Sequence, residues 1–452
     1  MHIRLRLVLA LLAAGLLLST VSGHSLARQA LLGQSREGLA SEASGTAVVP
    51  ATPQAVNVRS HGAAGQGRTD DTAAFGAAMK AALDSSVRHP QGPAGSPQAV
   101  VYVPRGVYRL LGLEFPSNVR LEVDAGAVLQ QAGGPAARIS GGGRAAHAPA
   151  LVSWDRPISG PPLKNVSIVG VNWADDGIKA GSSVEEGWDL GGSFTLNLDP
   201  ASTNASNAVA AVELNNVDGF LIQNVFSIQN DTPSSGYEWP TTSRAAIVLR
   251  ARRDSPVGGP IYDPRNGQVV NHHNVHSPRG YGPNQVNSAH NVTFSHIYSS
   301  GGTALRLETD GAERLYGSEI RGVRAEAITG VNCNRAVSFA PHDQNNYDVR
   351  VTNVMARNCY QGIIESIDES LSIEHRGGFY NSTVDGAMSI GGEGAQRPDS
   401  VDGWASGLSR QAYAKDRRVW NVVYSNVACS GTFERRSSRL MFPAGLIQPL
   451  CS

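Results

Sequence analysis

The sequence is poor in cysteine, in aromatic residues and in charge. Its 452 residues include four cysteines, 6% aromatic and 17% charged residues, and 38 basic side chains balance 38 acidic ones. A zero net charge gives no general attraction to nucleic acid or to a membrane surface, so we expect neither as a partner. Four cysteines can staple a chain of this length only locally. The low charge content and the 50 glycines favour a turn-rich β protein over a helical bundle or a disordered chain.

Long apolar runs are also scarce, and the clearest one is at the N-terminus. Arg4 and Arg6 precede an apolar stretch over residues 7–18, and small residues follow it. This pattern predicts a secretory signal peptide at 1–27, because the run is too short to span a bilayer comfortably; an uncleaved anchor is the alternative. We therefore expect a secreted protein, extracellular or periplasmic. Residues 28–55 lack an apolar period and predict a linker or disordered segment.

We expect the structured part to be a single domain over residues 56–452. A short strand at 56–58 leads through a glycine-rich turn to Asp70 and Asp71, either of which can cap a helix. The apolar face of that helix is predicted to hold Ala73, Phe75, Met79 and Ala82. The stretch VVYVPRGVYRL then predicts a strand, a turn and a second strand.

A repeated pattern of short alternating apolar runs fills most of the remaining chain. It occurs at 165–172, 218–230, 291–302, 316–330, 347–358 and 422–429, and no convincing helical period follows residue 85. Runs spaced by about one solenoid turn predict coils that bury their apolar faces only by stacking. Asparagine at the corners tolerates left-handed backbone and can hydrogen-bond one coil away. The pattern predicts an all-β fold, a right-handed parallel β-helix with an N-terminal capping helix.

The cysteines fit this periodicity without fixing their own pairing. Cys333 and Cys359 are 26 residues apart, which is about one coil. They are expected either to form a disulfide or to stack as small buried thiols. The pairing among these two, Cys429 and Cys451 is left open, because four cysteines allow three connectivities.

The decapeptide GGTALRLETD at 301–310 places two carboxylates at the end of a strand-like run. If Leu305 and Leu307 face the interior, then Arg306, Glu308 and Asp310 share the outer face. Residues i and i+2 of a strand are about 6.5–7 Å apart, and inverting glycoside hydrolases hold their two carboxyl groups about 6.5–9.5 Å apart. The alternative is a solvated charged face on which Arg306 bridges both acids.

Two longer stretches carry a resemblance to a known family. GYGPNQVNSAHNVTFSHIYSSGGTALRLETDG and VSFAPHDQNNYDVRVTNV, within about residues 270–358, closely resemble the iota-carrageenase family of glycoside hydrolases. The resemblance implies a β-helix enzyme that cleaves β-1,4 linkages of a sulfated galactan with inversion. It further implies that Glu308 is the general acid and Asp310 the general base, assisted by Gln285 and His342 from the neighbouring coils. The segment from GAAGQGRTDD to VVYVPRGVYRL resembles the start of pectin-lyase-like β-helix proteins.

A sulfated substrate would need cationic and aromatic side chains along its groove. The candidates are Arg279, Tyr281, Arg306, Arg335 and Arg350. No cofactor is expected to be required and no metal ligands are assigned, while a structural calcium or a bound chloride stays open. The expected partner is the polysaccharide itself, bound by a monomer.

Other motifs are weaker. Asp175 and Asp176 resemble the acid motif of polygalacturonases, but the three companion motifs of those enzymes are missing. The histidines of NHHNVHSPRG at 271–280 lack a carboxylate at metal-site spacing, and the acids of 365–375 predict a loop or a calcium site. Two further functions are kept as alternatives: a non-catalytic glycan-binding β-helix, and a polygalacturonase-like or lyase-like enzyme on another anionic polysaccharide.

Overall fold

The computed structural model describes the backbone of 19 segments of the chain, all within one compact unit, Val48–Ser452. They are residues 50–110, 113–131, 152–154, 162–172, 194–198, 210–215, 217–229, 245–252, 261–262, 269–270, 289–310, 319–333, 335–341, 345–357, 359, 361–365, 379–390, 419–426 and 428–430. The predicted signal peptide at 1–27 and most of the predicted linker at 28–55 lie outside these residues. No helix of the described segments is long and apolar enough to cross a membrane.

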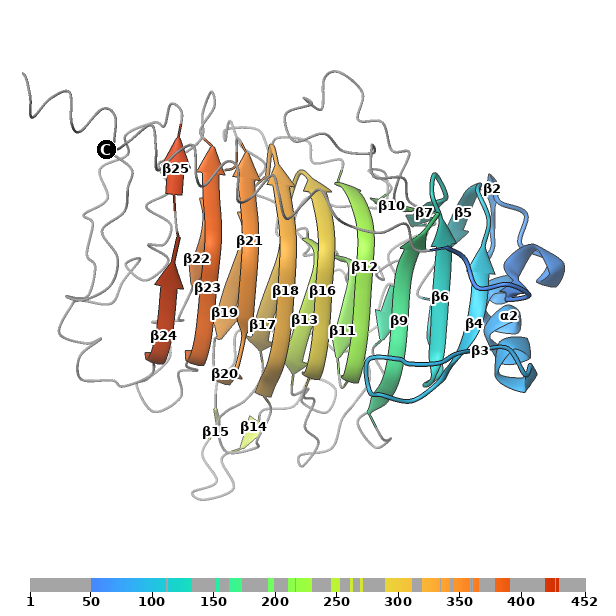
Figure 1. Cartoon of the computed structure of the whole chain (residues 1–452), viewed down its shortest axis with the longest axis horizontal. Coiled ribbons are helices and arrows are strands. Elements are labelled where there is room, and N and C mark those ends of the chain that lie inside the picture. Colours follow the sequence, from blue (N-terminus) through green and yellow to red (C-terminus); the bar gives the residue numbers. More distant parts are fainter. Residues whose placement is uncertain are drawn as a thin grey trace, which may run out of the picture. The chain divides into compact units, whose positions relative to one another are not determined.

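The described residues form a parallel β-helix, as predicted from the repeats (Figure 1). Its larger sheet, sheet A, is parallel except at the short strand β3. The strands of sheet A are β1 (Val56–Asn57), β2 (Gln66–Asp70), β3 (Arg88–His89), β4 (Gln98–Val103), β5 (Val107–Leu110), β6 (Val119–Asp124), β7 (Val128–Gln131), β9 (Leu163–Val171), β10 (Phe194–Leu198), β12 (Val217–Gln229), β16 (Ala289–Ser300), β18 (Glu319–Val331), β20 (Asn345–Tyr347), β21 (Arg350–Arg357), β23 (Phe379–Ile390), β24 (Val419–Ser425) and β25 (Ala428–Ser430).

A second parallel sheet, sheet B, runs behind the first one in Figure 1. Its strands are β8 (Val152–Trp154), β11 (Ala210–Asn215), β13 (Ala245–Arg252), β17 (Thr303–Asp310), β19 (Arg335–Pro341) and β22 (Gln361–Glu365). The chain alternates between the two sheets, so that β16 of sheet A is followed by β17 of sheet B and then by β18 of sheet A. A small antiparallel pair, β14 (Ile261–Tyr262) and β15 (Val269–Val270), lies outside both sheets.

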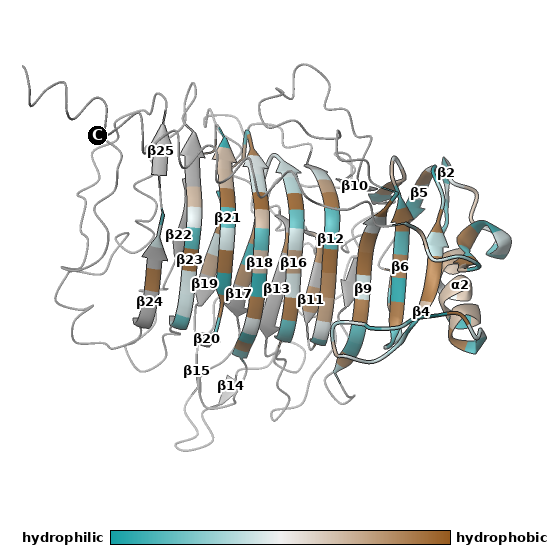
Figure 2. Cartoon of the chain, in the orientation of Figure 1, coloured by the Kyte–Doolittle hydropathy of each residue, from teal (hydrophilic) through white to brown (hydrophobic). Residues whose placement is uncertain are grey.

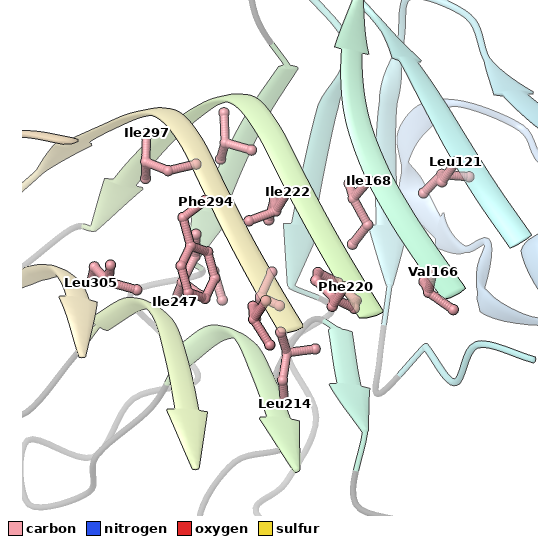
Figure 3. Close-up of a cluster of buried hydrophobic side chains, with 14 of the residues drawn as sticks. Leu121, Val166, Ile168, Leu214, Phe220, Ile222, Ile247, Phe294, Ile297 and Leu305 are labelled. Atoms are coloured by element: carbon pink, nitrogen blue, oxygen red, sulfur yellow. The ribbon is translucent and has the colours of Figure 1, made fainter. Parts of the chain in front are cut away.

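The core lies between the inner faces of sheets A and B (Figure 3). Phe220, Ile222 and Phe294 reach it from sheet A, and Ile247 and Leu305 reach it from sheet B; all five are fully buried. The same inner positions recur in register from coil to coil, for example Phe220 beside Val292 on the next strand. Figure 2 shows the resulting alternation of hydrophobic and hydrophilic bands along β12, β16, β18 and β21.

The predicted helix caps the N-terminal end of the solenoid, after the 3-10 turn η1 (Val58–His61). It is α2 (Thr72–Asp84), and its buried face consists of Phe75, Ala78, Met79 and Ala82. The expectation for Ala73 was wrong: it is exposed, because the helix turns Ala78 to the core instead. Asp70 Oδ1 accepts a hydrogen bond from the Thr72 amide at 2.9 Å, whereas Asp71 accepts one from the Ala64 amide at 2.7 Å.

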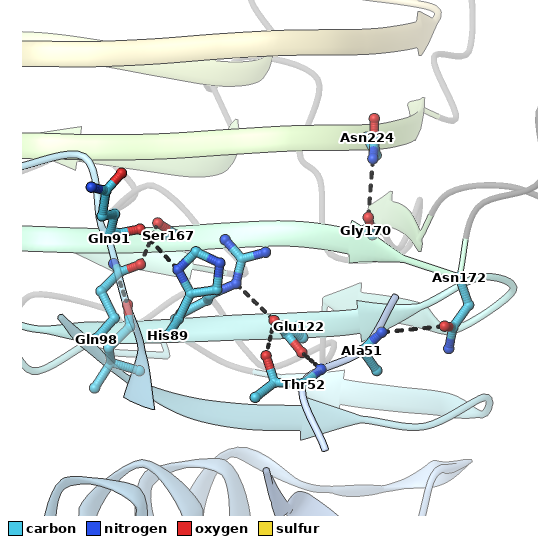
Figure 4. Close-up of polar contacts among 12 residues, drawn as sticks. Ala51, Thr52, His89, Gln91, Gln98, Glu122, Ser167, Gly170, Asn172 and Asn224 are labelled. Atoms are coloured by element: carbon cyan, nitrogen blue, oxygen red, sulfur yellow. Dashed lines mark hydrogen bonds and ion pairs between the residues drawn. The ribbon is translucent and has the colours of Figure 1, made fainter. Parts of the chain in front are cut away.

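Asparagine occupies the corners of the coils as predicted. Nine asparagines of the described segments have a positive φ between 46° and 64°: Asn118, Asn165, Asn172, Asn224, Asn291, Asn332, Asn353, Asn381 and Asn426. Several also bond to the neighbouring coil; Asn165 Nδ2 donates to Asn118 Oδ1 at 3.0 Å, and Asn224 Nδ2 donates to the Gly170 carbonyl at 3.0 Å (Figure 4). The repeated asparagines therefore stabilise the corners.

Cys333 and Cys359 form a disulfide that links consecutive coils. Both side chains are buried, and their Cα atoms are 4.4 Å apart. The disulfide interpretation of the 26-residue spacing is thus confirmed, and the stacked-thiol alternative is not.

Candidate active site

Strand β17 carries the Arg-Leu-Glu-Thr-Asp motif, and its burial pattern fixes which positions face outward. Leu305 and Leu307 are fully buried in the core, while Arg306 between them is partly exposed. The backbone continues as a strand through Asp310. Since alternate residues of a strand occupy opposite faces, positions 308 and 310 belong to the same outward phase as Arg306.

The coil before β17 places two arginine positions beside the two acids. In the register of β13 and β17, Arg250 is opposite Glu308 and Arg252 is opposite Asp310. Neighbouring strands are about 4.8 Å apart. The backbone therefore arranges two basic and two acidic positions in a square that spans two coils. On the other side of Glu308, the coil of β19 contributes Ala340.

The outer face of sheet B is covered where Arg306 lies. Arg306 is in register with Ser338 on β19, and Ser338 is only 1% exposed although it occupies the outward phase. The Ser338 Oγ atom is buried without a hydrogen-bond partner in the described part of the chain. The Ser338 hydroxyl therefore lies beneath the surface of this face.

The remaining predicted site residues are only partly placed. Gln285, His342, Arg279 and Tyr281 lie outside the described residues. Pro341, the residue before His342, is opposite Thr309 in the register of β17 and β19.

Arg335 is placed differently from the acid pair. It is in register with Thr303, five residues before Glu308, which corresponds to about 16 Å along a strand. It also shares the phase of Val337 and Phe339, which are buried in the core. The structure therefore places the partly exposed Arg335 at the opposite end of the strands from the acid positions.

The weaker motifs lie mostly outside the described residues. Asp175, Asp176 and the histidines at 272, 273 and 276 lie outside the described residues. Glu365 ends β22 in register with the core residue Phe339. Within the described ranges, no three His, Cys, Asp or Glu residues are grouped so that they could hold a metal ion.

The same five-residue pattern occurs a second time, in a place where its side chains are described. Strand β6 contains RLEVD at 120–124, against RLETD at 306–310. Leu121 and Val123 are buried in the core, so Arg120, Glu122 and Asp124 occupy the outward phase. Arg120 Nε lies 2.8 Å from Glu122 Oε1. An arginine two residues before a glutamate on a β-helix strand can thus pair with it directly.

The N-terminal segment covers Glu122 of this second acid pair (Figure 4). Glu122 is 1% exposed and accepts hydrogen bonds from the Thr52 amide and hydroxyl, at 2.6 Å and 2.8 Å. Asp124 accepts from the Tyr102 hydroxyl at 2.6 Å and from Asn172 Nδ2 at 2.6 Å. Burial, followed by the bond to Asp124, raises the pKa of Tyr102 to about 12.

The acids of β6 are therefore structural, since their oxygens are occupied by protein donors. The pattern Arg-Leu-Glu-x-Asp does not by itself specify a catalytic pair. What distinguishes the two copies is their surroundings: β6 is covered by residues 51–52, and β17 is flanked in register by Arg250 and Arg252.

The sequence analysis missed three residues of this face. Arg250 and Arg252 are separated from Glu308 by more than 50 residues, and only the register of β13 shows that they are neighbours. The alternation in AIVLRAR at 246–252 was a usable signal for an outward arginine pair. Ser338 precedes His342 by four residues and carries no signal of its own.

Comparison with known proteins identifies relatives of this chain. An iota-carrageenase from Alteromonas macleodii is 26% identical over 319 residues, which cover 69% of this chain and 53% of that protein. An iota-carrageenase from Zobellia galactanivorans is 25% identical over 279 residues, covering 60% and 48%. This chain is similar to the iota-carrageenases. The matches span about half the length of these two curated relatives.

Two further comparisons, with a family model and with a solved structure, also give matches. A family model described as rhamnogalacturonase A/epimerase, pectate lyase-like, matches residues 55–122, which span the capping helix and the first coils. A solved structure of an iota-carrageenase complexed to iota-carrageenan fragments is 17% identical, covers 90% of this chain and 96% of its own, and superposes with a TM-score of 0.43.

Proposed function

We propose that this relative of the iota-carrageenases is a secreted glycoside hydrolase. Its substrate would be a sulfated galactan of the iota-carrageenan type, cleaved within the polymer at β-1,4 linkages with inversion. The observation that carries the proposal is the pair of outward positions at Glu308 and Asp310 on β17, in a chain whose relatives bear the name iota-carrageenase. The enzyme would act as a monomer and require no cofactor.

In the proposed reaction the two carboxyl groups have opposite roles. Glu308, protonated, donates its proton to the glycosidic oxygen as the bond from that oxygen to the anomeric carbon breaks. Asp310, ionised, takes a proton from the water that attacks the anomeric carbon from the opposite side. Two strand positions span about 6.5–7 Å, which leaves room for that water and favours inversion over a covalent intermediate.

The other residues of the proposed site would position the substrate. Gln285 and His342 would assist the acid pair from the coils on either side. Arg306, together with Arg279 and Tyr281, would bind sulfate groups and sugar rings. Arg306 is the best supported of these, because it is partly exposed and lies two residues before Glu308 on the outward phase of β17.

Hydrolysis of a polysaccharide panel tests the proposal. Wild type, Glu308→Gln and Asp310→Asn would be compared on iota-carrageenan, other galactans and pectin by reducing-end release. Glu326→Gln, which removes an exposed carboxylate of β18, is the matched control. We expect cleavage of iota-carrageenan by wild type and by the control, and a loss of at least about 100-fold in each site variant. Proton NMR of the first product formed would show the inverted anomer.

One observation favours a competing function, which the same panel would reveal. The acids of the RLEVD copy on β6 are structural. By analogy, the competing function is a glycan-binding protein in which the acids of β17 have no catalytic role. That function requires wild type to bind the polysaccharide without releasing reducing ends. Activity that survives in both Glu308→Gln and Asp310→Asn would remove the acid pair from the mechanism.

A further inference from the structure

The outer face of sheet A holds a pair of arginines whose side chains have no partner among the described residues. Arg324 on β18 and Arg350 on β21 are opposite each other in the register of consecutive coils. Both are exposed, and neither side chain makes an ion pair or hydrogen bond with the rest of the described chain. Their backbones are one strand spacing apart, about 4.8 Å, so two like charges lie side by side and repel each other.

Two acids near this pair, Glu319 and Asp348, are already engaged by a different arginine. Arg321 lies 2.8 Å from Glu319 and 3.0 Å from Asp348, and its guanidinium lies 4.2 Å from the centre of the Tyr347 ring. The hydrogen bond from Arg321 lowers the pKa of Glu319 more than burial raises it, so Glu319 is ionised and bound to Arg321. Glu326, the next outward residue of β18 after Arg324, is exposed and makes no ion pair with it in the described part of the chain. No described ion pair therefore neutralises Arg324 or Arg350, and both can bind an external anion.

An aromatic stack borders the arginine pair. Tyr347 and Tyr380, from consecutive coils, stack with ring centres 5.0 Å apart and planes inclined by 21°. Both rings are partly exposed. Together with the guanidinium of Arg321 they form a row along the solenoid. On their strands, the residues of this row come one outward position before Arg324 and Arg350. The stacked tyrosine rings can contact sugar rings, and the two arginine side chains can bind anionic groups. The surface therefore suits a polymer that has both.

We propose that Arg324 and Arg350, bordered by the Tyr347–Tyr380 stack, form an accessory binding site for the sulfate groups of a sulfated polysaccharide. The class of ligand rests on the proposed function. The site is distinct from the acid pair: the inner faces of sheets A and B meet in one core, so their outer faces point in different directions. The accessory site would hold the polymer on the enzyme without cleaving it.

Affinity electrophoresis in gels containing iota-carrageenan tests this site. All variants carry Glu308→Gln to suppress cleavage, and Arg324→Gln/Arg350→Gln is compared with Arg68→Gln/Lys80→Gln, which also removes two exposed charges. We expect the first double variant to bind about tenfold more weakly and the control to bind as the parent does. Equal retardation of both double variants would show that the two arginines are merely solvated. Circular dichroism and Tm verify that each variant is folded.

Two further gels separate this proposal from the proposed function. A gel that contains dextran sulfate should retard the protein through the same arginines, and a gel that contains neutral dextran should not retard it. If wild type cleaves no polysaccharide but the Arg324/Arg350 variant still loses affinity, the hydrolase proposal fails and the accessory site stands. If wild type cleaves iota-carrageenan while the two double variants bind equally, the hydrolase stands and the accessory site is wrong.

Discussion

Arg250 is the in-register neighbour of Glu308 on the preceding coil. A positive charge about one strand spacing away favours the ionised form of a carboxyl group, whereas a general acid must be protonated when it acts. The backbone register therefore makes Arg250 the position to test for an effect on the protonation of the proposed acid.

This relationship predicts a change in the pH profile. In Arg250→Gln the alkaline limb of kcat/KM, which reports the free enzyme, should shift upward by about half a pH unit or more, because one nearby positive charge is lost. Arg250→Lys retains the charge and should leave the limb in place. The profiles would be measured on iota-carrageenan between about pH 5 and 10. If the alkaline limb of Arg250→Gln does not shift, Arg250 does not affect the pKa of the general acid.

The disulfide should stabilise the fold by closing one coil. Cross-linking residues 26 apart restricts the unfolded chain by about 3–4 kcal/mol in the chain-entropy model. We expect Cys333→Ala/Cys359→Ala to lower the Tm by several degrees, and reductant to lower that of wild type but not that of the variant. If the variant and wild type melt together in oxidising buffer, the bond does not stabilise the protein.

Asn224 combines a left-handed corner with a buried hydrogen bond. Its φ is 57°, it is 1% exposed, and it donates to the Gly170 carbonyl. Asn224→Ala loses the bond and adds backbone strain, so we expect a cost of about 2–4 kcal/mol in denaturant unfolding. Asn224→Gly loses only the bond and should cost less. If the two substitutions destabilise the protein equally, the left-handed backbone conformation does not contribute to the cost of Asn224→Ala.

Tyr102 predicts a decline of stability at alkaline pH. Its pKa is raised to about 12 in the folded protein, first by burial and then by Asp124, against about 10 in the unfolded chain. Below pH 10 or so both states are protonated, and above it the unfolded state ionises first, so stability falls as pH rises towards about 12. Tyr102→Phe should show a flatter decline of Tm between pH 9 and 11 or so. If the Tm of Tyr102→Phe declines as steeply as that of wild type, other groups cause the loss of stability.

The sequence by itself determined the solenoid and the phase of its strands. The alternating runs at 165–172, 218–230, 291–302, 316–330 and 347–358 correspond to β9, β12, β16, β18 and β21. This succeeds because a coil must bury every second residue and turn at a residue that tolerates positive φ, and both requirements are visible locally as apolar alternation and asparagine. The same locality explains why Leu305 and Leu307 could be assigned to the core.

Only the tertiary structure decided what stands next to each outward position. RLEVD and RLETD are nearly the same sequence, yet Thr52 covers the glutamate of the first and Arg250 flanks that of the second. These neighbours come from 70 and 58 residues away, at distances set by the lengths of the intervening loops. The strand register, and the segments that cover a given strand, are set by how the coils stack. The surroundings that distinguish a structural acid pair from a candidate catalytic pair therefore appear only in the assembled solenoid.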